Sequence, residues 1–114
     1  MKLADIDYEQ SMALVAEAEG SETGELIAMA RYDLDPETRL ADVALVVLDA
    51  FQNKGIGTTL FKQLVAHAKA QGVAGFTADV LVNNGRMLGI FNKSGERVET
   101  QLEGGIYRVK ITFS

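Results

Sequence analysis

The chain is poor in the residues that most often carry metal or redox chemistry. Its 114 residues include no cysteine, no tryptophan, one histidine and one proline. Without cysteine, a disulfide framework, a thiolate nucleophile and a sulfur-ligated metal site are excluded. A single histidine also argues against a zinc site, so we expect no metal. The cytoplasm, which does not favour disulfides, is the expected compartment.

Basic charge and long apolar stretches are also scarce. Eleven Lys and Arg residues stand against sixteen Asp and Glu residues, for a formal net charge of −5. Nucleic-acid binding relies on basic surface, so we expect no nucleic-acid partner, and the acidic balance mildly favours a cationic one such as an amine. No apolar run is long enough to span a bilayer, and the acidic start is unlike a signal peptide. We expect one domain over residues 1–114 with no membrane partner.

Apolar patterning in the first half of the chain predicts three strands. Two apolar runs joined by a glycine-bounded turn indicate a β-hairpin over residues 11–19 and 25–32. A second turn is expected at 33–37, because proline presets φ and aspartate favours turn starts. A third strand should follow over residues 39–48. Its last residues are apolar at consecutive positions, so we expect both of its faces to be covered.

The second half of the chain predicts two helices and three more strands. An apolar stripe at helical spacing indicates a helix over residues 58–71. The strand expected at 76–82 follows one helix after the previous strand, which predicts a right-handed βαβ unit with a parallel pair. A short helix at 86–92 and a final hairpin complete the order β-β-β-α-β-α-β-β. The expected fold class is α/β (α+β), with a mixed, mainly antiparallel sheet. The hairpin strands are expected at 97–102 and 106–113.

The junction between the third strand and the first helix carries the motif Gln52-x-x-Gly55-x-Gly57. Glycines lack a Cβ, so the backbone can approach a ligand closely. The first N–H groups of a helix are unpaired and carry partial positive charge. Together these features predict a phosphate cradle at residues 54–59 for an anionic cofactor, such as a pyrophosphate. No G-K-[ST] closes a Walker loop, and Leu60 stands where the third glycine of a Rossmann fingerprint belongs.

This motif, preceded by V-V at residues 46–47 and followed by the amphipathic helix, resembles the GNAT superfamily of acyl-CoA-dependent N-acetyltransferases. N-x-x-M-L beginning at Asn84 and F-x-K-x-G beginning at Phe91 are similar to the family's later segment. Residues 6–16 and 30–36 resemble one branch of it. That branch comprises bacterial protein-lysine acetyltransferases whose GNAT domain is joined to an ADP-forming acyl-CoA-synthetase-like region.

The resemblance implies the GNAT-like acyl-CoA N-acyltransferase fold, acetyl-CoA as cosubstrate, and an amine acceptor, with a protein lysine favoured. Family members begin with a strand and two helices that help to shape the acceptor site. The ten residues before the first expected strand are too few for these elements. We therefore expect a domain that lacks them, with a bare apolar sheet face and a bare edge strand. Such surfaces favour self-association or pairing with a missing N-terminal segment.

The resemblance also implies which residues meet the cofactor. Leu45 and Val47 would offer backbone groups to the pantetheine arm. Asn84 matches the family's cofactor-contacting asparagine, or else it only caps a loop. Lys54 and Arg86 are each either a phosphate contact or a solvated side chain. The residues expected around the pyrophosphate are Gln52, Asn53, Lys54, Gly55, Ile56, Gly57 and Thr58.

Acetyl transfer to an amine requires that the amine first lose a proton, because a lysine pKa lies near about 10.4. The resembling branch places a glutamate in the strand before the cofactor loop, and the matching residue is Asp42. Asp42 is either the base, acting through a water, or a solvent-facing strand residue. Many members protonate the departing thiolate with a tyrosine, where this chain has Phe91. These departures leave open an alternative, a catalytically silent CoA-binding or interaction module.

Overall fold

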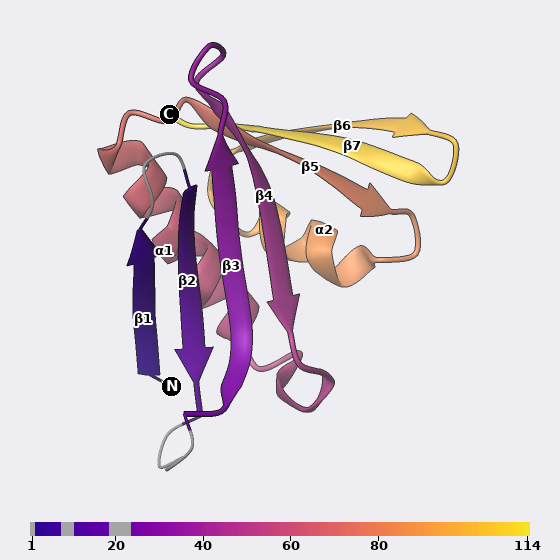
Figure 1. Ribbon diagram of the computed structural model, residues 1–114. Coiled ribbons are helices and arrows are strands. Elements are labelled where there is room, and N and C mark those ends of the chain that lie inside the picture. Colours follow the sequence, from indigo (N-terminus) through magenta and orange to yellow (C-terminus); the bar gives the residue numbers. More distant parts are fainter. Residues whose placement is uncertain (1, 8–10, 19–23) are drawn as a thin grey trace.

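The computed structural model describes residues 2–7, 11–18 and 24–114. Figure 1 shows them as one twisted sheet accompanied by two helices. The elements are β1 (Lys2–Asp7), β2 (Ser11–Glu17), β3 (Leu26–Leu34), β4 (Leu40–Val47), the 3-10 turn η1 (Asp49–Phe51), α1 (Ile56–Ala70), β5 (Gly75–Leu81), α2 (Gly85–Asn92), β6 (Arg97–Glu103) and β7 (Ile106–Thr112).

The seven strands form one sheet in the order β1-β2-β3-β4-β5-β7-β6. Only β4 and β5 are parallel, and every other neighbouring pair is antiparallel. The predicted fold class, the parallel pair and the order of elements from residue 11 onward are therefore confirmed. Several boundaries differ by one or two residues; for example, β3 continues to Leu34 and the following turn begins at Asp35, whose carboxylate accepts the Glu37 N–H at 2.9 Å.

The prediction that no strand precedes residue 11 is wrong. β1 pairs with β2 from Lys2↔Glu17 to Asp7↔Met12. Its six residues show no decisive pattern of their own, and the pairing with an existing strand edge is what makes them a strand. The two helices are absent between β1 and β2, because three residues, 8–10, cannot contain them.

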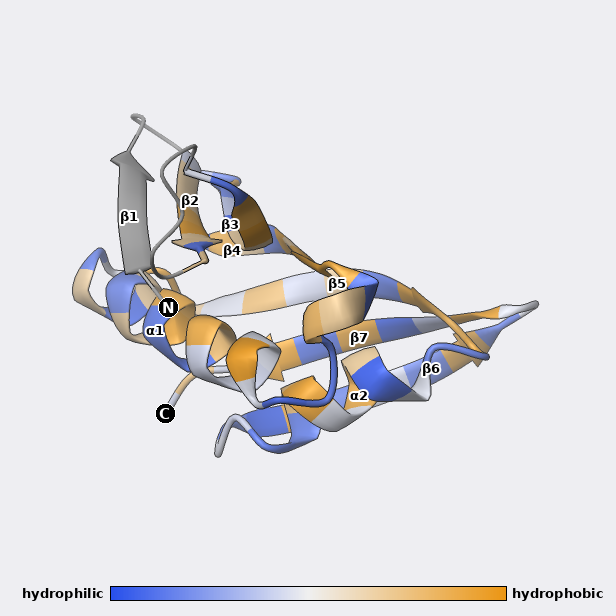
Figure 2. Cartoon of the chain, turned by 90° about the horizontal axis from the view of Figure 1, so that it is seen from below, coloured by the Kyte–Doolittle hydropathy of each residue, from blue (hydrophilic) through white to orange (hydrophobic). Residues whose placement is uncertain are grey.

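Both helices lie on the same face of the sheet, as Figure 2 shows. The predicted stripe of α1 is buried there, including Leu60, Phe61 and Leu64. The Phe61 ring lies 5.9 Å from that of Phe76 on β5 and 5.0 Å from that of Phe91 on α2. This aromatic contact joins the two helices to the sheet in a single core.

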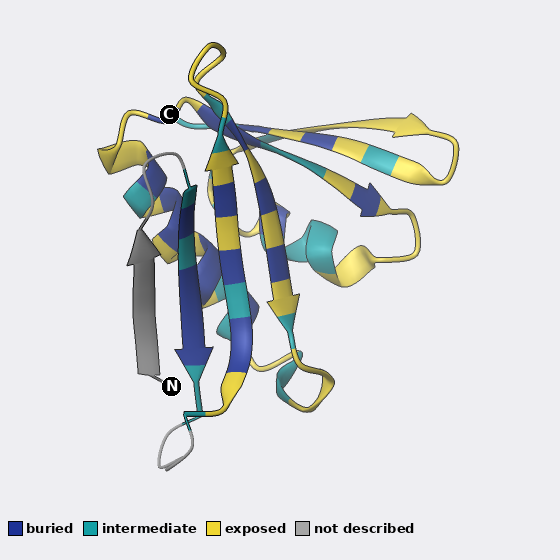
Figure 3. Cartoon of the chain, viewed as in Figure 1, coloured by how far each residue is buried: buried dark blue, intermediate teal, exposed yellow. Residues whose placement is uncertain are grey.

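The opposite side of the sheet, here called the open face, carries no helix of the described residues. The expectation that both faces of β4 are covered is wrong, because Val46 is 54% exposed and the following Leu48 44% exposed. Figure 3 shows the resulting alternation of buried and exposed positions along β3 and β4. The sequence predicted an apolar sheet face. The open face instead mixes charged, polar and apolar side chains. From the strand registers it includes Ala13, Met29, Arg31, Asp33, Asp42, Ala44, Val46, Thr77, Asp79, Leu81, Arg108 and Lys110.

The parallel pairing of β4 with β5 is short. It covers only Leu40↔Gly75, Ala41↔Phe76 and Asp42↔Thr77. Beyond these residues the two strands diverge, which Figure 1 shows as β5 turning away from β4. Among the described residues, the backbone of β4 past Asp42 therefore has no strand partner on that side, and apart from the Val47 carbonyl, which accepts a hydrogen bond from Gln52, its groups are open to another ligand.

Glu96, in the turn between α2 and β6, ties the end of the chain to α1. Its side chain is 5% exposed and forms an ion pair with Lys69. Its Oε2 accepts the N–H and the hydroxyl of Ser114, at 3.2 and 3.3 Å. Burial alone raises the pKa of Glu96, but the hydrogen bonds from Lys69 and Ser114 more than offset this and leave that pKa below its ordinary value.

We expect Glu96→Gln to lower the free energy of unfolding by about 1–2 kcal/mol at neutral pH, because charge-assisted hydrogen bonds are lost. A depressed folded pKa means that the stabilisation is complete above the pKa of an unfolded glutamate, about 4.3, and is lost as pH falls through the folded value. Urea denaturation from neutral to acidic pH should therefore show the two proteins converging. Glu99→Gln, at an exposed ion pair, is the control and should change stability by less than about 0.5 kcal/mol. A difference that persists unchanged in acid would contradict the assignment.

Candidate functional site

The loop between β4 and α1 adopts the sharp geometry that its glycines predict. Gln52 braces it by donating from Nε2 to the Val47 carbonyl at 2.9 Å and to Asp49 Oδ1 at 3.2 Å. Asn53 and Gly55 have φ values of 62° and 80°, in the left-handed region that glycine and asparagine tolerate. Gly55 is the N-cap of α1 and no side chain caps the helix, so its first N–H groups face the loop.

Next to this loop lies a cavity of about 510 Å³, here called the cradle. The structure thus brings six of the expected cofactor residues together around one space at a helix N-terminus. Arg86 on α2 and Lys93 directly after it also line the cradle, which makes the site locally cationic in an acidic protein. The expected residues that line the cradle are Val47, Gln52, Asn53, Gly55, Gly57 and Thr58.

Of the α2 residues at the cradle, the sequence pointed only to Arg86, and the others were missed. Arg86 donates from Nε to Asn53 Oδ1 at 3.2 Å and also contacts Gln52 Oε1, so it links α2 to the loop. Helical spacing is the signal that could have found this face, since residues three and four apart share one side of a helix. Four residues of α2 line the cradle: Gly85, Arg86, Gly89 and Ile90. Lys93, which directly follows α2, lines it as well.

Four expected cofactor residues do not line the cradle. Leu45 is buried behind Gly57, and Ile56 is partly buried against the core. Lys54 lies over the Phe51 ring, with Nζ 5.6 Å from its centroid. Asn84 is the N-cap of α2, where its Oδ1 accepts the Met87 N–H at 3.2 Å.

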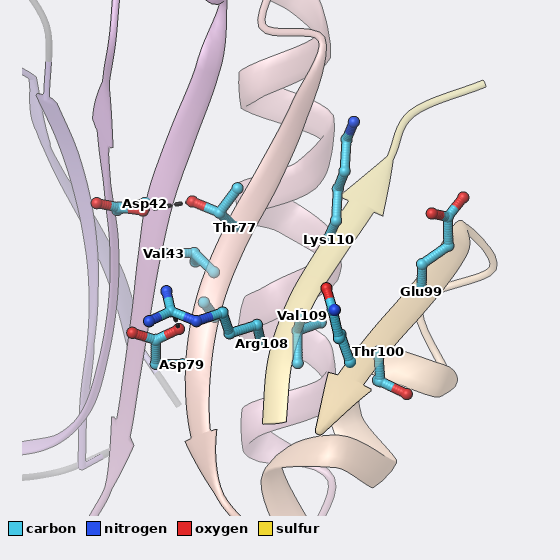
Figure 4. A pocket seen from close by; sticks show the side chains of 11 residues that line it. Asp42, Val43, Thr77, Asp79, Glu99, Thr100, Arg108, Val109 and Lys110 are labelled. Atoms are coloured by element: carbon cyan, nitrogen blue, oxygen red, sulfur yellow. Dashed lines mark hydrogen bonds and ion pairs between the residues drawn. The ribbon is translucent and has the colours of Figure 1, made fainter. Parts of the chain in front are cut away.

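A second cavity, of about 830 Å³, opens on the sheet where β4 and β5 separate, and Figure 4 shows it from close by. We call it the hollow. Asp42 stands at its upper end in that view and accepts a hydrogen bond from the Thr77 hydroxyl across the parallel pair. Val43 and Ala78 also line it, although the strand registers place their side chains on the helical side of the sheet. Its other lining residues are Asp79, Glu99, Thr100, Gln101, Arg108, Val109 and Lys110.

The carboxylates near the hollow have different partners. Asp33 faces Asp42 in the β3–β4 register, but it accepts the Ser11 hydroxyl at 2.6 Å and the Arg31 guanidinium at 2.8 Å. The Ser11 hydrogen bond and the Arg31 charge hold the pKa of Asp33 below its ordinary value, against the opposing effect of burial. Asp79 lies 3.7 Å from Arg108. Of these three, Asp42 alone faces the gap between β4 and β5 without a cationic partner among the described residues.

Phe91 occupies the position at which many relatives place a tyrosine, and it is 1% exposed. Its ring packs on Phe61 in the core, so it offers no proton to either cavity. Among the described residues no three His, Cys, Asp or Glu side chains gather as a metal site would need. No helix of the described part of the chain is both long and apolar enough to cross a membrane.

Comparison with known proteins agrees with this architecture. Residues 2–95 match the Acetyltransferase (GNAT) family, and the chain belongs to that family. It is 35% identical over 94 residues to "Acetyltransferase Pat" of Mycolicibacterium smegmatis, an alignment that covers 82% of this chain and 28% of that relative. The GNAT family predicted from the motifs is therefore confirmed.

Two solved structures are also similar. The GNAT domain of S. lividans PAT superposes with a TM-score of 0.77 at 28% identity, covering 91% of this chain and 61% of that one. A cAMP-binding acyltransferase from Mycobacterium smegmatis gives a TM-score of 0.78 at 28% identity, covering 95% of this chain and 33% of that one. The chain thus spans about a third or less of the longer relatives it resembles.

Proposed function

We propose that this domain is an acetyl-CoA-dependent N-acetyltransferase that moves an acetyl group directly from CoA to an amine, with a protein lysine as the favoured acceptor. The observation that carries the proposal is the separation of β4 from β5 after three paired residues. β4 runs from Asp42 at the hollow to Val47 at the cradle, so a single strand connects the two cavities. Relatives named as acetyltransferases support the same chemistry.

The residues of the cradle suit the anionic end of acetyl-CoA. The uncapped N–H groups of α1 and the cations Arg86 and Lys93 would face its pyrophosphate. The pantetheine arm would follow β4, where Leu45 and Val47 have backbone groups beside the missing strand pairing. The thioester would then reach the gap where Asp42 and Thr77 stand.

In the proposed reaction the acceptor enters from the open face as an ammonium ion. Asp42 takes one proton from it through a water, and the neutral amine attacks the thioester carbonyl carbon. A C–N bond forms, the attacking nitrogen releases its second proton to solvent, the C–S bond breaks, and CoA leaves as a thiolate. No side chain at Phe91 can protonate that thiolate, so solvent does. A thiol pKa of about 8.5 makes this leaving group tolerable.

Calorimetric titration of the domain with acetyl-CoA and with desulfo-CoA is the first test. Saturable binding of both, followed by acetylation of a lysine peptide, is the expected result. Binding of both without transfer to any amine would favour the alternative, a silent CoA-binding module. The burial of Phe91 and the absence of helices between β1 and β2 are the observations that keep this alternative in view. Failure of both ligands to bind would overturn the proposal.

Gly57→Ala is expected to weaken desulfo-CoA binding about tenfold or more, which corresponds to ~1.4 kcal/mol. An added Cβ would lie 2.8 Å from Ile90 Cδ1 and 3.4 Å from Val47 Cγ2. To make room for the new methyl group, the Cδ1 end of the Ile90 side chain has to swing aside. Ile90 lines the cradle, so this movement takes up space in the cradle. Titration of the variant measures the effect.

Gly105→Ala is the matched control for Gly57→Ala. Its added methyl meets no atom within 4 Å, and the residue lies in the β6–β7 turn away from the cradle. It should bind desulfo-CoA as the native chain does. Unchanged affinity in Gly57→Ala would place the ligand away from the first turn of α1.

A further inference from the structure

β6 is one of the two edge strands of the sheet, and of the usual protections of such an edge it has charged side chains but no proline, lysine or bulge. Its outer side has no partner among the described residues. β6 contains no proline and no lysine, and its register with β7 runs without a bulge from Arg97↔Thr112 to Glu103↔Ile106. A regular edge of this kind is a template for pairing with another strand. Figure 1 shows β6 on the outer side of the β6–β7 hairpin.

The turn decides which backbone groups of β6 point outward. Gly104 and Gly105 form a two-residue loop, and Gly104 has a φ of 59°, as the first central residue of a type II′ turn requires. In such a hairpin the flanking residues, Glu103 and Ile106, bond to each other. Bonding alternates along an antiparallel pair. The outward N–H and C=O groups of β6 therefore belong to the alternate residues Val98, Thr100 and Leu102.

The sequence of β6, R-V-E-T-Q-L-E, is complementary to itself when two copies run antiparallel about Thr100. Thr100 then faces Thr100 of the second copy, and Val98 faces Leu102, so outward backbone groups meet outward ones. On the open face, Arg97 faces Glu103 at both ends of the pairing. Leu102, 60% exposed in the single chain, gains an apolar neighbour. Opposite charges and apolar side chains directly across a pair both favour it.

The neighbouring registers are disfavoured by charge. Centring the pairing on Glu99 places this carboxylate opposite itself. Centring it on Gln101 places Glu99 opposite Glu103 of the second copy. If the two-fold axis passes between two residues, each residue with outward-pointing backbone groups faces a residue whose groups point inward, and the two cannot bond. Like charges directly across a pair are destabilising, so the Thr100-centred register is favoured over these neighbours.

We propose that a second copy of this chain pairs with β6 in the antiparallel register centred on Thr100, continuing the sheet across a two-fold axis. The contact needs neither the cradle nor Asp42, although its central residue, Thr100, also lines the hollow. It puts self-association at the edge opposite the one that the sequence analysis expected to be bare, which β1 instead extends. An edge contact of this length is smaller than a standard interface, so the dimer is weak and concentration-dependent.

A single introduced cysteine tests the axis, because the native chain has none. Thr100→Cys places the thiol on the two-fold axis, where a disulfide to the second copy is within reach. Val98→Cys is the matched control, since its thiols lie four residues apart along the paired strands and cannot meet. Under mild oxidation we expect Thr100→Cys to form linked dimers about tenfold or more faster than Val98→Cys. In guanidinium both should link at the same slow rate.

Exchanging the charges of Arg97 and Glu103 gives a second test. Sedimentation velocity measures it, at concentrations up to those used for NMR. Arg97→Glu should shift the native chain toward monomer, and the double variant Arg97→Glu/Glu103→Arg should restore the dimer. Circular dichroism checks that each variant folds. Equal linking of Thr100→Cys and Val98→Cys in the folded state would overturn the proposal. A monomer at every concentration, or a dimer indifferent to Arg97→Glu, would also overturn it.

Discussion

Asp42→Asn is expected to lower the rate of acetyl transfer by about 10²–10⁴-fold while leaving desulfo-CoA affinity unchanged. The asparagine keeps the size of the side chain and can still bond to Thr77, but its amide cannot take a proton from an ammonium acceptor. Because Asp42 lies on the open face and the cradle lies at the other end of β4, proton transfer and cofactor binding should separate cleanly. Steady-state kinetics with a lysine peptide, paired with calorimetry, measures both quantities.

Asp33→Asn is the matched control for this experiment. Asp33 has the same chemistry and stands opposite Asp42 in the β3–β4 register, but it already bonds to Ser11 and Arg31 and does not line the hollow. Its replacement should lower stability modestly and leave turnover near the native value. Turnover that survives in Asp42→Asn would show that another group, or water alone, deprotonates the acceptor.

Gly75→Ala is expected to lower the free energy of unfolding by about 2–4 kcal/mol. A Cβ at this position would lie 2.3 Å from the Ile111 carbonyl oxygen on β7 and 3.3 Å from Leu40 Cδ2 on β4. The nearer atom belongs to backbone that β5 and β7 hold in register, so it cannot swing aside as a flexible side chain can. Urea denaturation followed by circular dichroism gives the change.

The control for Gly75→Ala is Gly89→Ala, inside α2. Its added methyl meets nothing within 4 Å, and alanine favours a helix over glycine by about 0.5–1 kcal/mol, so this variant should be unchanged or more stable. Gly75 is also where β4 and β5 begin their short parallel pairing. Wild-type stability in Gly75→Ala would mean that β5 and β7 tolerate a wider spacing at this position.

Patterns confined to one segment were readable from the sequence. The stripe of α1 was, because its residues bury one face of one helix, and so was the hairpin turn at Gly104-Gly105. The glycine loop was also readable, since positive φ at Gly55 and the uncapped helix start are local properties of the backbone. These local features were sufficient to predict the family, most of the fold and one wall of the cradle.

Contacts between distant segments were decided only by the tertiary structure. β1 is a strand because β2 offers an edge, and Val46 is exposed because both helices lie on the other face. Arg86 becomes part of the cradle because α2 packs beside the β4–α1 loop. The bond from Thr77 to Asp42 spans 35 residues of sequence and exists because the parallel pairing places them side by side. Local patterns specify turns, stripes and strand ends, whereas packing specifies which of them meet, because that depends on every element at once.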